Sequence, residues 1–445
     1  MKRVLFVLFA LVSLTASART RYPLSEDWRF QFGFENNADR ARYVSLPHTW
    51  NGDALAGVYP YLRTQGLYFR TLYAPKEWAG KRLFLRFGGV ENVADLFVNG
   101  CFVASHRGGG VAFTIEITDY VLRGAKNELV VAVSNSKRND LMPAASERNS
   151  YGGISREVEL LVTDQAAISP LYYGSDTIDP ERAEGHAVLH LSVPSPQSVS
   201  VVLKAYDEAG TCCMEQRRTL KSNYDYKQPI QIPFAILNPK AWSPESPALY
   251  RFEASISSGE SHDTVAVTTG LRRISLTAGG GLRINGKRTE LRALSLAYDH
   301  PACASLLGQE EIDRDIELLQ EVGANALFSP EGPHAPYLYE QCDRLGLLAR
   351  IDLPFLRTNY LSDLNYCASP AFEEQGIELL RSIIAQHFNH PSVVLWGLFC
   401  DLKIIDERLS DYLKRLNQTA HASDPTRPTL ATSNQDGDLN FITDG

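Results

Sequence analysis

The chain has few methionines and no excess of positive charge. Methionine occurs three times in 445 residues, and the seven cysteines are odd in number and match neither a disulfide framework nor a zinc-ligand spacing. We interpret most cysteines as small buried residues and expect no metal site and no cofactor. Lys and Arg number 44 against 52 Asp and Glu, so the sequence lacks the basic surface that nucleic-acid binding needs.

Long apolar runs are absent after the N-terminus, and we therefore expect no membrane span, which needs about 20 apolar residues. At the N-terminus, Lys2 and Arg3 precede an apolar run over residues 4–14, and Ala16 and Ala18 occupy the positions of a cleavage site. This pattern is typical of a signal peptide. We expect residues 1–18 to be removed and the mature chain to be periplasmic or secreted.

Apolar and aromatic residues are plentiful. Hydrophobic residues make up 44% of the chain and charged residues 22%, which excludes a disordered chain or a coiled coil. A length of 445 residues, at about 150 residues per domain, predicts roughly three domains. The twenty Tyr, nineteen Phe and five Trp indicate β-rich domains with aromatic cores or aromatic-lined clefts.

The first predicted domain, residues 19–165, has short strands with alternating apolar residues. The clearest are residues 83–87, 94–98 and 102–105. Asn99 and Gly100 separate the last two, and an Asn-Gly pair between alternating strands favours a tight hairpin because both residues accept positive φ. Turn signals recur about every ten residues, which predicts a jelly-roll β-sandwich.

The second predicted domain, residues 166–277, resembles an immunoglobulin-like β-sandwich. It has strand patterns at residues 187–193, 198–206, 230–234, 250–257 and 263–269. About a hundred residues with strands at this spacing are typical of that fold.

The third predicted domain, residues 278–445, alternates strands with helices. Strand patterns at residues 291–296, 324–328, 347–353, 393–398 and 429–432 are separated by helical patterns. Repeated βα units of this kind predict a parallel sheet, and here the N-terminal part of a (β/α)8 TIM barrel. Closure of such a barrel needs eight strands. Either the sequence is a fragment of a longer protein, or it is a degraded reading frame, or the barrel interpretation is wrong; we favour a fragment.

Six short motifs occur in the order found in glycoside hydrolase family 2, the β-galactosidase and β-glucuronidase group. The chain resembles that family at residues 46–50 (LPHTW), 152–156 (GGISR), 242–250 (WSPESPALY), 285–292 (NGK followed by LR), 342–346 (CDRLG) and 389–396 (NHPSVVLW). The resemblance implies a jelly roll, an immunoglobulin-like domain and a catalytic TIM barrel, acting on an oligo- or polysaccharide.

The resemblance also implies where the chemistry lies. A retaining glycosidase uses two carboxyl groups, an acid/base and a nucleophile. Asp401 matches the position of the family's acid/base glutamate, one methylene shorter, and Cys400 replaces the Asn that binds the sugar 2-hydroxyl. The nucleophile lies on a later strand, outside this sequence. We also expect Trp396 and Glu331 beside the substrate.

Four positions depart from the family pattern. Phe328 stands where the family has Arg, Glu331 where it has His, and Ala297 where it has another His; Cys400 is the fourth. Each candidate also has a structural interpretation: Asp401 as a cap or ion-pair partner, Glu331 as a surface carboxylate, and Trp396 as a core residue.

Two functions follow from these observations. The first is a β-galactosidase-type hydrolase of terminal β-glycosidic bonds, impaired or incomplete in this sequence. The alternative, motivated by the four departures, is a catalytically silent carbohydrate-binding relative.

Overall fold

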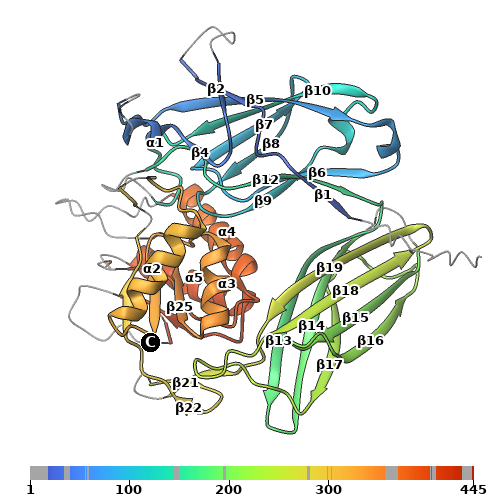
Figure 1. Cartoon of the computed structure of the whole chain (residues 1–445), viewed down its shortest axis with the longest axis vertical. Coiled ribbons are helices and arrows are strands. Elements are labelled where there is room, and N and C mark those ends of the chain that lie inside the picture. The colour runs from blue at the N-terminus through green and yellow to red at the C-terminus, as the bar shows by residue number, and fades with distance from the viewer. Residues whose placement is uncertain are drawn as a thin grey trace, which may run out of the picture.

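The computed structural model describes residues 19–34, 41–55, 57, 60–143, 150–193, 197–277, 281–297, 299–301, 303–355, 369–400, 402, 407–432 and 443–444. The expected signal peptide, residues 1–18, and the expected acid/base, Asp401, lie outside these ranges. The described residues form two β-sandwiches and an α/β part, in the predicted order (Figure 1).

The first sandwich has two antiparallel sheets, of order β1-β12-β6-β9 and β3-β2-β5-β10-β7-β8. Alternate residues of β6, at 83, 85 and 87, face the core because successive side chains of a strand point to opposite faces. Asn99 and Gly100 both have positive φ, which confirms the predicted hairpin. The elements are β1 (Thr20–Pro23), β2 (Trp28–Phe32), β3 (Arg42–Val44), β4 (His48–Thr49), α1 (Trp50–Leu55), β5 (Gln65–Ala74), β6 (Arg82–Phe87), β7 (Val93–Val98), β8 (Cys101–Arg107), β9 (Phe113–Glu116), β10 (Ala125–Ser134), β11 (Gly153–Ile154) and β12 (Val158–Thr163).

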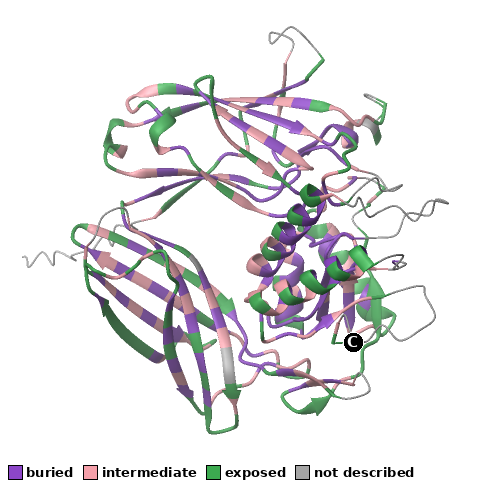
Figure 2. Ribbon diagram, turned by 180° about the vertical axis from the view of Figure 1, so that it is seen from behind, coloured by how far each residue is buried: buried purple, intermediate pink, exposed green. Residues whose placement is uncertain are grey.

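The second sandwich packs a three-stranded sheet, β13-β14-β17, on a four-stranded sheet, β16-β15-β18-β19. Buried and partly exposed residues alternate along these strands, as the banding in Figure 2 shows, and the inward residues form one apolar cluster. The strands are β13 (Ala167–Ile178), β14 (Arg182–Ser192), β15 (Val199–Tyr206), β16 (Cys212–Leu220), β17 (Ile230–Leu237), β18 (Tyr250–Ser258) and β19 (Ser261–Thr269).

The α/β part contains a parallel sheet of order β23-β24-β25-β26-β27, preceded by a small antiparallel sheet, β20-β21-β22. Strands and helices alternate along the chain, as in the predicted TIM-barrel fold. The elements are β20 (Ile274–Thr277), β21 (Gly281–Ile284), β22 (Lys287–Arg288), β23 (Ala293–Ser295), α2 (Gln309–Glu321), β24 (Ala326–Ser329), α3 (Pro336–Leu345), β25 (Leu348–Asp352), α4 (Pro370–His387), β26 (Val393–Gly397), α5 (Glu407–Ser423) and β27 (Thr429–Leu430).

Helix α4 and the residues just after it connect the barrel to both sandwiches through amide side chains. The Gln386 amide accepts from the Ala112 backbone N–H at 2.8 Å and donates to the Ala112 carbonyl at 3.0 Å. Gln375 accepts from the backbone N–H of Met142 at 2.8 Å. Asn389 accepts from the backbone N–H of Tyr173, in the second sandwich, at 3.0 Å, and donates to a neighbouring carbonyl of the same strand. The contacts are made to backbone atoms of the two sandwiches.

Two buried arginines add further inter-domain hydrogen bonds of the same kind. Arg156 of the first sandwich donates to the carbonyl oxygen of Gly110 in its own domain and to that of Pro333 in the barrel, each at 2.8 Å. Arg272, which follows β19, donates to the carbonyl oxygens of Pro391 and Val393 at 2.7 and 2.9 Å. The three parts are therefore held together by specific polar contacts.

None of the described helices is both long and apolar enough to cross a membrane.

Candidate active site

The carboxyl ends of the parallel strands bring the candidate residues to one edge of the sheet. Asp352 is the last residue of β25, Cys400 follows β26, Glu331 follows β24, and Thr432 follows β27. Parallel strands end at the same edge, and TIM-barrel enzymes build their active sites there.

A buried ion pair lies at the end of β25. Arg350 donates from Nε and Nη2 to the two oxygens of Asp352, at 2.7 and 2.8 Å. The two residues are separated by two positions and therefore lie on the same face of the strand. Asp352 is fully buried, and this burial raises the pKa of its carboxyl while the Arg350 charge opposes the rise. A carboxylate this deep needs a partner of opposite charge, and Arg350 supplies it.

Arg350 also covers Phe328, which stands where the resemblance led us to expect an arginine. Phe328 on β24 pairs in register with Arg350 on β25, and the guanidinium carbon lies 4.6 Å from the Phe328 ring centroid. This distance is typical of a cation–π contact. A guanidinium therefore lies beside position 328, supplied by the neighbouring strand β25.

Cys400 is partly exposed at the end of β26. Its backbone N–H donates to the Phe355 carbonyl at 3.1 Å, and the Thr432 hydroxyl donates to its sulfur at 3.3 Å. A thiol is a weaker hydrogen-bonding group than the amide it replaces. Asp401, the next residue, lies outside the described residues, and the structure therefore gives no geometry for it.

Trp396 lies in the core and not at the mouth of the site. Its side chain is fully buried, its indole N–H donates to Asp424 at 2.9 Å, and Arg427 packs on its ring at 5.3 Å. Asp424 and Arg427 lie between α5 and β27, before the amino end of that strand, whereas the candidate site lies at the carboxyl ends of the strands. This placement argues against the predicted substrate contact and supports the alternative interpretation of Trp396 as a core residue.

The loop after β24 holds Glu331, which is half-buried, together with the buried His334. His334 Nε2 lies 3.2 Å from the Leu296 carbonyl, and burial lowers the pKa of its imidazole to about 4. His334 is therefore neutral at neutral pH.

The first sandwich contacts this edge of the barrel at two loops. Arg156 donates to the Pro333 carbonyl in the loop after β24, and the Tyr151 hydroxyl donates to Asp299 after β23. The GGISR motif thus lies beside the candidate active site, and the sandwich helps to position two loops of that site.

Sequence reasoning did not identify Arg350, His334 or the contact between Tyr151 and Asp299 as parts of this site. Arg350 left a signal, because a charged residue inside an otherwise apolar strand needs a buried partner. The contact from Tyr151 left none, because the two residues are 148 positions apart.

The chemistry available at this edge is that of carboxyl groups. Within the described ranges, no group of three or more His, Cys, Asp or Glu side chains is arranged to hold a metal ion. A carboxyl group at a strand end can act as a proton donor, a base or a nucleophile according to its pKa and its neighbours.

Family models match nearly the whole chain from residue 27 onward. Residues 27–164 match the sugar binding domain of glycosyl hydrolases family 2, residues 175–272 match a second family 2 model, and residues 275–444 match the family's TIM barrel domain.

Individual relatives and solved structures agree with these models. A β-glucuronidase from Bacteroides fragilis is 38% identical over 99% of this chain and 64% of that protein. The crystal structure of a putative β-galactosidase from the same species is 27% identical, with a TM-score of 0.85, over 96% of this chain and 66% of that one. A Bacteroides uniformis β-glucuronidase structure is 26% identical, with a TM-score of 0.84, over 96% of this chain and 54% of that one. The chain spans about half to two thirds of the length of these proteins, and it belongs to glycosyl hydrolase family 2.

Proposed function

We propose that the protein is a retaining β-glycosidase that hydrolyses terminal β-glycosidic bonds of an oligo- or polysaccharide. The observation that carries the proposal is the match of three family 2 models, in order, over residues 27–164, 175–272 and 275–444. The matched barrel brings carboxyl-bearing strand ends to one edge, as such chemistry requires.

In this proposal Asp401 is the acid/base. A retaining glycosidase protonates the leaving oxygen with one carboxylic acid while a second carboxylate, about 5–5.5 Å away, attacks the anomeric carbon. Asp401 directly follows Cys400 at the end of β26, the strand that carries the acid/base in the family. The proposal places the nucleophile outside the 445 residues.

Glucuronides are the first substrates to test. The relative at 38% identity is named a β-glucuronidase, whereas the related β-galactosidase from Thermoanaerobacter pseudethanolicus is 25% identical. Galactosides are the second choice. The N-terminal pattern over residues 1–18 supports export of the mature chain to the periplasm or the medium.

The test uses the natural protein translated from its complete coding sequence. We expect hydrolysis of 4-nitrophenyl β-D-glucuronide or β-D-galactoside that falls at least a hundredfold in Asp401→Ala. The matched control is Asp411→Ala, since Asp411 is an exposed carboxylate on α5 and should be dispensable. Turnover unaffected by Asp401→Ala would exclude Asp401 as the acid.

A catalytically silent carbohydrate-binding relative is the second candidate. The Phe328, Glu331, Ala297 and Cys400 departures from the family pattern favour it. Absence of turnover of both substrates, with retained binding of the sugar, would support this candidate against the enzyme.

A further inference from the structure

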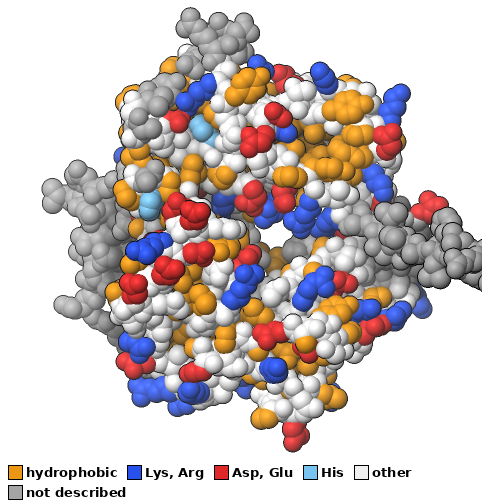
Figure 3. Space-filling view, viewed as in Figure 1, with side chains coloured by type: hydrophobic (Ala, Val, Ile, Leu, Met, Phe, Trp, Pro, Cys, Tyr) orange, Lys and Arg blue, Asp and Glu red, His pale blue; other side chains and the backbone are white. Residues whose placement is uncertain are grey.

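The three parts of the molecule surround an open cavity of about 630 Å³ that is separate from the candidate active site. Figure 3 shows the molecule hollowed near its centre, with Lys and Arg side chains gathered beside the opening. Ligand sites commonly have volumes of roughly 300–1,000 Å³ and often lie between domains. This cavity therefore has the size and the location of a small-molecule site.

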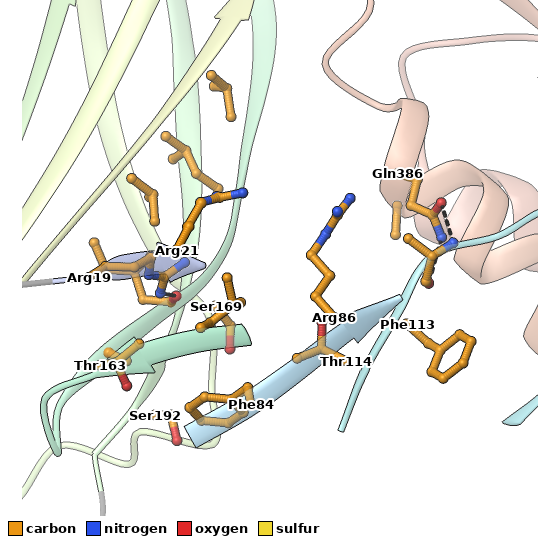
Figure 4. A pocket seen from close by; sticks show the side chains of 18 of the residues that line it. Arg19, Arg21, Phe84, Arg86, Phe113, Thr114, Thr163, Ser169, Ser192 and Gln386 are labelled. Carbon is orange, nitrogen blue, oxygen red and sulfur yellow. Dashed lines mark hydrogen bonds between the residues drawn. The ribbon is translucent and has the colours of Figure 1, made fainter. Parts of the chain in front are cut away.

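One wall of the cavity is the outer face of the first sandwich. It presents three arginines, Arg19 and Arg21 from the N-terminal strand region and Arg86 from β6. Figure 4 shows the side chains of Arg21 and Arg86 directed into the same space, with Gln386 of α4 beyond them. None of the described residues that line the cavity is an Asp or a Glu. The arginines are therefore the charged side chains that line the cavity, and the carboxylates that pair with them do not line it.

The acidic partners of these arginines leave donor capacity on two of them. Arg19 is bound in bidentate fashion by Asp263, at 3.1 and 2.7 Å. Arg21 and Arg86 share one oxygen of Glu159, each at 3.3 Å, and Arg86 also meets Glu157 at 3.0 Å. Charge-assisted hydrogen bonds are commonly about 2.7–2.9 Å long, and a guanidinium has five N–H donors. Arg21 and Arg86 can therefore bind an additional oxoanion.

The other walls suit the body of a sugar. Thr114 of the first sandwich and Ser169 of the second are exposed and line the cavity, and the apolar residues Leu171, Tyr172 and Val267 also line it from the second sandwich. A pyranose ring has apolar C–H faces and a hydroxylated edge. Apolar side chains and hydroxyls together match such a ring better than they match a bare inorganic anion.

We propose that this inter-domain cavity binds an acidic saccharide, with its carboxylate held by Arg21 and Arg86. Arginine is suited to this task because its planar fork matches a carboxylate. The choice of a saccharide over other organic acids rests on the proposed function, but the arginine site itself does not. The site is non-catalytic, so it is tested by binding and not by turnover.

The experiment measures binding of D-glucuronate to the purified protein by titration calorimetry at low salt. We expect binding that weakens at least tenfold in Arg21→Gln and in Arg86→Gln, and D-glucose should bind at least tenfold less tightly than glucuronate. Ser169→Trp, which places a large ring in the cavity, should also abolish binding. The matched control is Arg182→Gln, because Arg182 is an exposed arginine of β14, paired with Glu184, that does not line the cavity.

Thermal unfolding of each variant shows that it is folded before binding is measured. Glucuronate binding that survives both arginine substitutions, or the absence of binding to the unmodified protein, would overturn the proposal. Equal binding of inorganic phosphate and glucuronate would refute the saccharide assignment. Turnover of a neutral aryl β-glycoside, measured in parallel, tests the proposed function separately, since neither arginine belongs to the active site.

Discussion

Replacing Arg350 with leucine should destabilise the barrel strongly. Arg350 neutralises the fully buried Asp352 through two hydrogen bonds, and leucine leaves that carboxylate without its cation. Removing one member of a buried ion pair costs about 3–5 kcal/mol, because the remaining charge is then buried without a partner. The loss should therefore be several kcal/mol in the free energy of unfolding.

The loss should depend on pH in a defined direction. Burial already raises the pKa of Asp352 above its ordinary value, and removal of Arg350 should raise it further. Asp352 of the folded variant then binds a proton more tightly than it does in the unfolded chain, where an aspartate has a pKa of about 3.9. The destabilisation should consequently increase as the pH rises through the folded pKa, and it should be smaller at pH 5 than at pH 8.

The assay is hydrogen exchange of peptides from β25 and β26, measured by mass spectrometry across a urea series at both pH values. This readout reports on the barrel and not on the two sandwiches. The control variant is Arg314→Leu, an exposed arginine of α2, which should change stability by less than about 0.5 kcal/mol.

A second variant tests the cause of the loss. The double substitution Arg350→Leu with Asp352→Leu removes both charges and should recover most of the lost stability, since buried pairs replaced by apolar residues are often neutral. A single variant that costs less than about 1 kcal/mol, or a double variant as unstable as the single, would refute the reasoning.

Three further outcomes are expected. Gly397→Ala should lower stability by about 1–3 kcal/mol in urea unfolding, because the added methyl carbon would lie 1.8 Å from an oxygen of Asp352; an unchanged midpoint would contradict this. Acidification from pH 6.5 to 4 should destabilise the fold, because the pKa of buried His334 is lowered to about 4 and the unfolded chain binds the proton more readily. His334→Gln should reduce that pH dependence of the melting temperature, and an unaltered dependence would exclude His334 as a source. In the natural protein, Asp401→Glu should raise kcat/KM on an aryl β-glycoside, because misplacement of the acid by about 1 Å can lower the rate on the order of a hundredfold. Adding Cys400→Asn should raise kcat/KM again. Unchanged kcat/KM in both variants would argue against the roles assigned to Asp401 and Cys400.

The fold was largely predictable because its signals are local. The alternation at residues 83, 85 and 87 reflects one buried and one partly exposed face of an antiparallel sheet. The Asn99-Gly100 pair reflects a turn that requires positive φ. After residue 278 the sequence pattern alternates between strands and helices, and this alternation predicted the parallel sheet.

The orientation of the site residues was less predictable. All residues of β26 are buried, so hydrophobicity does not reveal which face each one occupies. The pairing of β25 with β26 also shifts register between Ala349 and Arg350. Beyond this irregularity Gly397 faces Asp352, whereas the neighbouring Trp396 points to Asp424. A sequence pattern alone does not reveal such a shift.

The amide contacts of α4 have a consequence for how the protein tolerates sequence drift. Gln375, Gln386 and Asn389 bind main-chain atoms of the two sandwiches, and every non-proline residue presents the same N–H and carbonyl groups. Most substitutions at the contacted positions 112 and 142 would therefore preserve docking, and proline at either position would remove the N–H and break it. The contacts made by these amides can thus persist while the side chains they face diverge. A foreign sandwich of the same backbone course could therefore be grafted onto this barrel if it kept Arg156 and Tyr151, whose side chains also contact the barrel.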